Sequence, residues 1–298
     1  MPAVWEARQM NQNNTTHGGA IIVAGTPLGN SDDASPRLRH ALATADVVAA
    51  EDTRRARSLA AAMDVDISGR VVSNFDHNEA SRVDTLIDEA KHGRTVLVVS
   101  DAGMPVISDP GFPLVERAYD EGIHVGCVPG PSAVTTALAM SGLHVGTFCF
   151  EGFAPRKTGA RREWLASLVS ERRACVFFES PHRLAETLAA AAEMIDDQRR
   201  AAVCRELTKV YEEVRRGTLA ELAAWAAGGV RGEITVVIEG ARNRVVHPPI
   251  DDLVDDVEAR VRADGLRLKD ACKVVAEQWG MKRRELYEAV LDTRKRSE

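Results

Sequence analysis

The sequence of 298 residues predicts an α/β protein, in which two α/β domains are followed by a small C-terminal helical tail. Three observations support this fold class. Short apolar segments alternate with amphipathic segments from residue 20 to about residue 240, as in chains that form a sheet covered by helices. The character of the apolar segments changes near residue 143. Beyond residue 250 only helical patterns remain.

The first domain is predicted over residues 20–142, with a parallel sheet. Its apolar segments, residues 20–24, 46–50, 95–99 and 123–128, are nearly continuous in apolar side chains. Strands of a parallel sheet are covered on both faces and show this pattern. The amphipathic segments 37–45, 53–63 and 79–92 are the helices expected between these strands.

Four predicted helices share one kind of start. Ser35, Asp109, Gly130 and Ser180 each precede a proline at the beginning of a helical pattern. A small polar residue or glycine suits the N-cap, and proline suits the first helical position, where no backbone hydrogen bond is lost. We therefore expect helices to begin at these prolines. The last three follow closely after a strand, at the sheet edge where open α/β folds bind ligands.

The second domain is predicted over residues 143–241, with a mixed sheet. Its expected strands are residues 173–178, 200–204, 212–217 and 233–239. Two of these segments carry charges along their length, which indicates strands less deeply buried than those of the first domain.

Residues 242–250 contain Pro248 and Pro249 and are predicted to be a linker, and residues 251–298 a helical tail. Gly280 is expected to end one tail helix before another runs over residues 282–291. One face of the first of these helices is apolar, with Leu268, Ala271, Cys272, Val275 and Trp279.

The chain is expected to be cytoplasmic, with no membrane partner. Residues 1–19 are polar and rich in asparagine, which predicts a disordered extension and not a signal peptide. No apolar run approaches the roughly 20 residues that cross a bilayer. Five single cysteines match neither a disulfide scaffold nor a zinc site, so we expect buried thiols in a reducing compartment. They are Cys127, Cys149, Cys175, Cys204 and Cys272.

Several familiar signatures are absent. The loop at residues 25–30 is no G-x-G-x-x-G motif, and the chain has no Walker P-loop. His77 and Glu79 imitate the H-x-E of zinc deaminases, but no P-C-x-x-C follows, so no metal is predicted. Ser132 lies in no nucleophile elbow, because Val134 stands where that motif needs glycine. These absences exclude the usual dehydrogenases, nucleotide hydrolases and serine hydrolases.

Residues 100–111 form the most informative segment. They leave a predicted buried strand and enter a helix through a long loop with two glycines and two prolines. Such a loop is stiff, lets a ligand approach the backbone closely and offers peptide N–H groups near a helix start. The same composition also suits a connection with good capping chemistry and no ligand. The residues alone leave both interpretations open.

Nine blocks in a fixed order carry a resemblance to a known family. In order and spacing they resemble the bacterial 16S ribosomal RNA cytidine 2′-O-ribose methyltransferases, which belong to the tetrapyrrole-methylase-like class. The resemblance extends from residue 20 to about residue 295. Two positions depart from the family pattern: Ala24-Gly25 replaces a proline, and Met104 stands where threonine is common. The blocks are residues 26–30, 49–54, 76–79, 100–111, 129–132, 148–153, 179–183, 205–209 and 232–233.

The resemblance implies that S-adenosylmethionine binds in a cleft between the two α/β domains, and that the protein is a homodimer. Carried over block by block, eight residues are expected to contact this cofactor. They are Asp101, Ala102, Gly103, Met104, Ser132, Ala133, Phe178 and Leu207.

Methyl transfer to a ribose hydroxyl needs a base, because the hydroxyl is a poor nucleophile at neutral pH. Ionisable residues at the predicted strand ends are the candidates, and the residues alone single out none of them. The same groups also suit an internal salt-bridge network that holds the two domains together. Arg54 and Arg183 are expected to clamp phosphate or carboxylate groups, since a guanidinium binds them in bidentate fashion. The candidate bases are Glu51, Asp52, Asp76, His77, Glu79 and Lys209.

RNA contact must come from local charge, because the net charge is −6. The segment at residues 155–162 carries four cations and no anion: Arg156, Lys157, Arg161 and Arg162. The tail adds Lys282, Arg283 and Arg284. Both groups suit phosphate binding, and the segment at residues 155–162 suits a solvated loop equally well. Aromatic residues make up only 5% of the chain, so stacking on bases is not the expected mode of recognition.

The predicted function is therefore S-adenosylmethionine-dependent 2′-O-methylation of a cytidine in the decoding region (P site) of 16S ribosomal RNA in the small ribosomal subunit. One alternative is a precorrin-type tetrapyrrole methyltransferase on the same fold. Another is a non-catalytic ribosome-assembly protein, which need not bind the cofactor. Fold alone does not decide between them.

Overall fold

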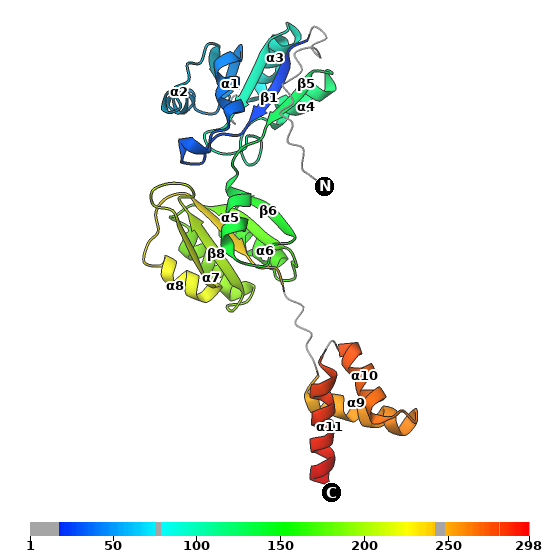
Figure 1. The fold of residues 1–298 in the computed structure, drawn as a ribbon. Helices are drawn as coiled ribbons and strands as arrows, with labels where there is room; N and C mark the ends of the chain where they lie inside the picture. The colour runs from blue at the N-terminus through cyan, green and yellow to red at the C-terminus, as the bar shows by residue number, and fades with distance from the viewer. Residues whose placement is uncertain (1–17, 75–78, 242–247, 280, 298) are drawn as a thin grey trace. The chain divides into compact units, whose positions relative to one another are not determined.

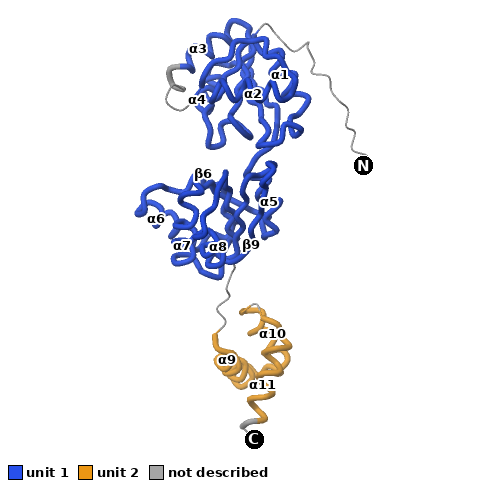
Figure 2. The backbone as a smooth tube through the Cα atoms, turned by 90° about the vertical axis from the view of Figure 1, so that its left-hand side faces the viewer, with its two compact units in different colours: residues 1–241 blue, residues 242–298 orange. Residues whose placement is uncertain are grey.

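The computed structural model describes residues 18–74, 79–241, 248–279 and 281–297, with the backbone alone at residues 79–81, 296 and 297. Two compact units are present, Met1–Ala241 and Arg242–Glu298 (Figure 2). Most of the predicted N-terminal extension, residues 1–17, lies outside the described residues. No described helix is both long enough and apolar enough to cross a membrane.

The first sheet of the larger unit is parallel, as predicted. Its strand order is β3-β2-β4-β1-β5, and every neighbouring pair runs in the same direction. The strand β3 was not predicted, because it has only four residues, starts with Arg70 and buries no residue fully. The strands are β1 (Ala20–Ala24), β2 (Val47–Ala50), β3 (Arg70–Ser73), β4 (Thr95–Val99) and β5 (His124–Val128).

Helices cover both faces of this sheet (Figure 1). The helices α1 (Pro36–Thr44) and α2 (Thr53–Ala62) pack in one apolar cluster with Val48 and Leu97. The helices α3 (Glu79–Lys91) and α4 (Phe112–Asp120) pack in another with Val47 and Val96. Side chains of successive residues in β2 and β4 therefore enter opposite clusters, which explains why these segments are apolar throughout.

The prediction of helix starts is confirmed at α1 and wrong at the other three sites. Ser35 caps α1, accepting a hydrogen bond from the Leu38 N–H at 3.1 Å. The helices α4, α5 (Ala133–Ser141) and α7 (Leu184–Met194) begin two or three residues after the predicted proline. At α4 the reason is Gly111, whose φ of 134° places it outside the helix.

The second sheet is mixed, as predicted, with the order β6-β7-β10-β8-β9. The strands β6 and β7 are parallel, and the other pairs are antiparallel. The helix α5 packs on one face. The helices α6 (Thr158–Leu168), α7 and α8 (Leu219–Ala226) pack on the other. The strands are β6 (Phe148–Phe153), β7 (Ala174–Glu179), β8 (Arg200–Arg205), β9 (Glu213–Thr218) and β10 (Ile234–Ile238).

The smaller unit contains α9 (Ile250–Ala263), α10 (Leu268–Trp279) and α11 (Arg283–Ser297). The predicted apolar face of α10 is confirmed: Ala271, Cys272 and Val275 are buried, and Leu268 and Trp279 pack against them. Helix α11 continues six residues beyond the predicted end, since its exposed face carries arginine and lysine, which favour the helical state.

The five cysteines are free, and the prediction of buried thiols is wrong for Cys127. This residue is exposed because β5 is an edge strand of the first sheet. Cys149 is half-buried, and the other three are buried.

We predict that Gly25→Ala destabilises the protein by about 1–3 kcal/mol, the usual cost of overpacking. A Cβ on Gly25 would lie 2.7 Å from the Gly130 Cα and 2.8 Å from the Gly130 N, so backbone would have to move. Urea unfolding of the full chain measures the loss. Gly146→Ala is the control, because its Cβ would meet no atom within 4 Å. Equal midpoints for the two variants would contradict the prediction.

Candidate functional site

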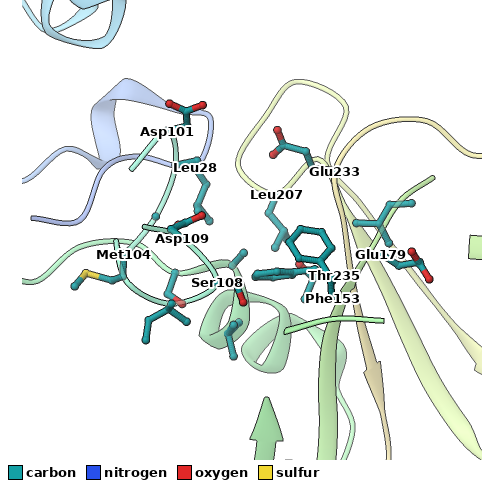
Figure 3. A pocket seen from close by; sticks show the side chains of 18 of the residues that line it. Leu28, Asp101, Met104, Ser108, Asp109, Phe153, Glu179, Leu207, Glu233 and Thr235 are labelled. Atoms are coloured by element: carbon teal, nitrogen blue, oxygen red, sulfur yellow. The ribbon is translucent and has the colours of Figure 1, made fainter. Parts of the chain in front are cut away.

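A cavity of about 440 Å³ lies within the larger unit and is lined by residues from both of its sheets. Its lining comes from the loops after β1, β2, β4 and β5, the ends of β6, β7 and β8, and the start of β10. These positions are the sheet edge at which ligands are expected. The volume lies within the range of small-molecule sites. Figure 3 shows Asp101, Met104 and Asp109 on one side and Leu207, Glu233 and Thr235 on the other.

All eight residues that the resemblance assigns to the cofactor line this one cavity. They belong to four separate segments of the chain, which only the tertiary fold brings together. The side chain of Leu207 is buried, and Phe178 is half-buried. The eight residues are Asp101, Ala102, Gly103, Met104, Ser132, Ala133, Phe178 and Leu207.

The loop at residues 100–111 has an unusual backbone that the fold holds in place. Thr26 and Gly103 exchange backbone hydrogen bonds, with N···O distances of 2.8 and 3.1 Å. Gly103 has a φ of 84°, and Val106 and Ser108 have φ values of 77° and 64°. A positive φ is costly for a β-branched residue, and such positions cluster at ligand sites. The conformation favours the ligand-binding interpretation over a plain connection.

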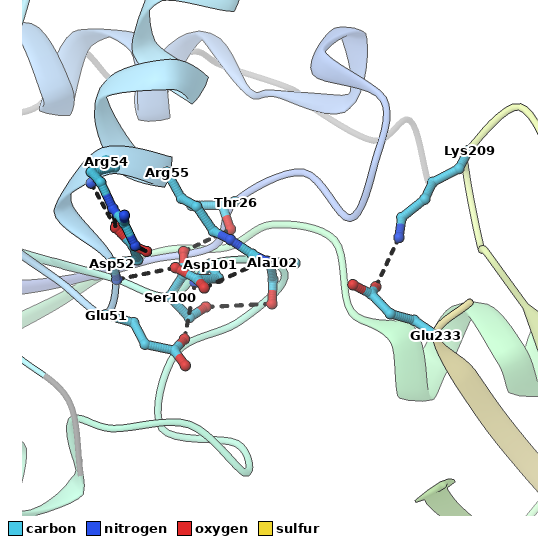
Figure 4. Close-up of polar contacts among 10 residues, drawn as sticks. All are labelled: Thr26, Glu51, Asp52, Arg54, Arg55, Ser100, Asp101, Ala102, Lys209 and Glu233. Atoms are coloured by element: carbon cyan, nitrogen blue, oxygen red, sulfur yellow. Dashed lines mark hydrogen bonds and ion pairs between the residues drawn. The ribbon is translucent and has the colours of Figure 1, made fainter. Parts of the chain in front are cut away.

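Backbone N–H groups tie the ends of β2 and β4 together through two carboxylates. The Asp52 N–H donates to the Asp101 Oδ1 at 3.1 Å, and the Asp101 N–H donates to the Glu51 Oε2 at 3.2 Å. The Arg55 Nη1 lies 3.2 Å from the Asp101 Oδ2 (Figure 4). Glu51, Arg55 and Asp101 also line the cavity. These contacts form part of the cavity wall, but all three lie on the side of the parallel sheet and do not link the two predicted domains.

Asp52 is an N-cap and lies outside the cavity lining. Its carboxylate accepts hydrogen bonds from the Arg54 N–H at 2.8 Å and the Arg54 Nη2 at 2.9 Å. The bond from the Arg54 side chain, followed by that from its backbone, lowers the pKa of Asp52 to about 2. So acidic a carboxyl group is a weak proton acceptor at neutral pH. Arg54 is 87% exposed and is held by this pair.

Lys209 is a cation held between two carboxylates. Its Nζ lies 3.0 Å from the Glu206 Oε1 and 3.0 Å from the Glu233 Oε2. Burial acts to lower the pKa of Lys209, but the hydrogen bonds to Glu206 and Glu233 outweigh it, so the pKa is raised. Lys209 therefore stays protonated at neutral pH, which disfavours it as a base. Its stem packs on the backbone of Gly29.

Three other candidate bases have no described side chain. Asp76 and His77 lie outside the described residues, and Glu79 is described only as the first residue of α3. Glu51 is thus the one candidate base among the described side chains that lines the cavity.

Two of the predicted RNA contacts are corrected by the structure. Arg161 is only 2% exposed and forms an ion pair with Glu186. Arg183 lies 2.6 Å from the buried Glu179 and donates to the Ala154 carbonyl at 3.2 Å. A buried carboxylate needs such a partner, so Arg183 binds a carboxylate, one of its two expected roles, and does not contact RNA phosphate.

The remaining predicted RNA contacts are exposed. Arg162 pairs with Glu193 at 3.2 Å, and Arg284 pairs with Glu288 at 2.8 Å. Arg156 and Lys157 form no ion pair with any residue that the structure describes. Lys282 and Arg283 are exposed at the start of α11.

The cavity also contains residues that the sequence did not single out. Asp109, Phe153 and Glu179 belong to recognised blocks, but nothing in the pattern says which block members face a ligand. Arg55 and Thr235 carried no signal of their own. All five line the cavity.

We predict that Lys209→Met lowers the free energy of unfolding by about 0.5–1 kcal/mol at pH 7, the range for partly exposed pairs. The Glu233 N–H, followed by Lys209, lowers the pKa of Glu206 below 4.5. A lowered pKa stabilises the fold above pH 4.5, and the contribution is lost as the pH falls through the folded-state pKa. The difference from wild type should therefore shrink below pH 4.5 in urea unfolding, and Lys209→Arg should retain most of the stability. A difference that grows on acidification would contradict this account.

Two family models match separate parts of the chain. The model of the family Tetrapyrrole (Corrin/Porphyrin) Methylases matches residues 20–223, and that of the RsmI C-terminal HTH domain matches residues 248–294. The methyltransferase CobJ has a solved structure similar to this chain, with a TM-score of 0.58 and 20% identity. The match covers 75% of this chain and 95% of CobJ. At this identity the likeness supports the fold alone.

Two relatives are similar over nearly their whole length. The ribosomal RNA small subunit methyltransferase I of Mycobacterium tuberculosis is 61% identical, over 93% of this chain and 96% of its own. The protein of the same name from Halalkalibacterium halodurans is 41% identical, over 90% of this chain and 93% of its own. The resemblance seen in the nine blocks is confirmed: the chain belongs to the tetrapyrrole methylase family and, within it, to the ribosomal RNA small subunit methyltransferase I proteins.

Proposed function

We propose that this chain transfers a methyl group from S-adenosylmethionine to the ribose 2′-hydroxyl of a cytidine in the decoding region (P site) of 16S ribosomal RNA. One observation carries the proposal: eight residues from four segments meet in one cavity, in a chain whose relatives are named as small-subunit methyltransferases. We further propose that the substrate is the small ribosomal subunit, that the protein acts in the cytoplasm and that it is a homodimer.

The cavity fits S-adenosylmethionine in size and chemistry. Leu28, Phe178 and Leu207 supply apolar surface, and Gly103 presents backbone without a side chain. The carboxylate of Asp101 is fixed by the Asp52 N–H and Arg55. Apolar walls with a few fixed polar groups are typical of cofactor sites. When bound, the cofactor supplies a methyl group on a positively charged sulfur.

The chain's own residues align the reactants and accept a proton. The cavity walls come from both sheets, and in-line displacement depends on the alignment of donor and acceptor between them. We propose Glu51 as the group that takes the proton from the ribose hydroxyl, because its carboxylate lines the cavity. Asp52 is too acidic for this role, and Lys209 is held as a cation.

The exposed cations are proposed to bind phosphates. Arg156 and Lys157 lie in the segment that follows β6, whose last residue lines the cavity. In the smaller unit, Lys282, Arg283 and Arg284 form a second basic group at the start of α11, within the segment matched by the HTH-domain model. Phosphate contacts of this kind set affinity and orientation without reading sequence.

We predict that the purified chain methylates small subunits isolated from cells lacking its gene, and that the label lies on the ribose of one cytidine. Mass mapping of nuclease fragments identifies the nucleotide, and naked 16S RNA serves as the comparison substrate. Methylation of a tetrapyrrole in place of the RNA would favour the precorrin-type alternative. Failure to bind S-adenosylmethionine in calorimetry would favour the non-catalytic one.

We predict that Glu51→Gln lowers kcat by about 10²–10⁴-fold, the usual contribution of a general base. The amide keeps the size of the side chain and its acceptor for the Asp101 N–H, so the affinity for S-adenosylmethionine should change less than threefold. Single-turnover methyl transfer and calorimetry measure the two quantities. Glu116→Gln on the exposed surface of α4 is the control. Activity of Glu51→Gln within threefold of wild type would remove Glu51 from the mechanism.

A further inference from the structure

Phe153 is an exposed aromatic residue in the cavity wall. The residue is 60% exposed, although it lines the cavity (Figure 3). Its ring packs edge-on against Phe178, with a centroid distance of 5.3 Å and an interplanar angle of 61°. Edge-to-face packing is a preferred aromatic geometry and restrains the ring. Phe153 is therefore accessible to a ligand in a defined orientation.

The backbone places Phe153 at the mouth of the cavity. The register of β6 on β7 shifts between Phe150 and Phe153, and Gly152 has a φ of 66°. Irregularities of this kind re-aim side chains beside active sites. A Cβ on Gly152 would lie 3.4 Å from the Ser108 Oγ, so this turn lies against the loop at residues 100–111. The ring is thus held beside the loop proposed to bind the methyl donor.

Two cationic residues follow Phe153 three and four positions later in the chain. Arg156 and Lys157 are exposed and pair with no described carboxylate, whereas Arg161 and Arg162 are both paired. An exposed ring next to unneutralised cations is the combination with which proteins bind unpaired nucleotides: the ring stacks on a base and the cations bind phosphates.

We propose that Phe153 is the stacking platform for the base of the target nucleotide, while Arg156 and Lys157 bind the neighbouring phosphates. The nucleotide would be drawn out of the RNA so that its ribose enters the cavity. The inference rests on the proposed function and adds a substrate-binding residue to it. It also revises the expectation from composition, since a low aromatic content says nothing about a single ring in the cavity wall.

The test is Phe153→Leu, which keeps an apolar side chain and removes the π face. The KM for small subunits should rise by about tenfold or more, because stacking contributes on the order of 1–3 kcal/mol per base. The kcat should stay within about threefold, and the Kd of S-adenosylmethionine within twofold by calorimetry. Phe153→Trp should restore the KM. Phe148→Leu is the matched control, since Phe148 lies on the same strand, is 44% exposed and does not line the cavity.

Three results would overturn the proposal. A KM for Phe153→Leu equal to that of Phe148→Leu would show that the ring does not hold the substrate. If Phe153→Leu weakened the binding of S-adenosylmethionine as much as it raised the KM for small subunits, the ring would contact the cofactor and not the RNA base. Binding of a fluorescent decoding-region oligonucleotide separates this inference from the proposed reaction. If the wild-type chain transfers no methyl group, weaker binding by Phe153→Leu alone still supports the platform, and equal binding overturns it.

Discussion

The site depends on the hydrogen bonds that hold the loop at residues 100–111 against the segments after β1 and β2. The paired backbone hydrogen bonds between Thr26 and Gly103 join this loop to the segment after β1. The carboxylates of Glu51 and Asp101 join it to the segment after β2. Buried or half-buried backbone groups need partners, and here the partners come from the ends of two other strands, β1 and β2. The loop can therefore hold left-handed residues that a free segment would avoid.

Environment separates ionisable residues that look equivalent in the sequence. Glu51 and Asp52 are adjacent, yet one faces the cavity, and the other caps α2 with a strongly lowered pKa. Arg161 and Arg162 are also adjacent, yet one is buried in an ion pair and the other is exposed. Arg161 and Arg162 lie in α6, where helical geometry turns successive residues by about 100°. Glu51 and Asp52 lie before α2, where the extended backbone of the N-cap Asp52 points its side chain at the first turn of the helix.

Both sheets contribute apolar and polar groups to the cavity. The side of the parallel sheet supplies Leu28 and Met104 together with Asp101, and the side of the mixed sheet supplies Phe178 and Leu207 together with Glu233. Apolar walls with a few placed polar groups are typical of small-molecule sites. The division of the larger unit into domains at residues 20–142 and 143–241 remains a proposal, which the two separate sheets support.

The sequence by itself determined the α/β class, the parallel and mixed sheets, the helical tail and the family. These features could be predicted because hydrophobic periodicity and ordered motifs are visible in short stretches of the sequence. It did not reveal β3 or β6, since short strands with charged or half-exposed residues lack that periodicity. The tertiary structure alone decided which residues share the cavity, that Arg161 and Arg183 are held by glutamates, and that Phe153 stays exposed. These outcomes depend on contacts between segments far apart in the chain, and no local pattern encodes which partner a side chain will meet.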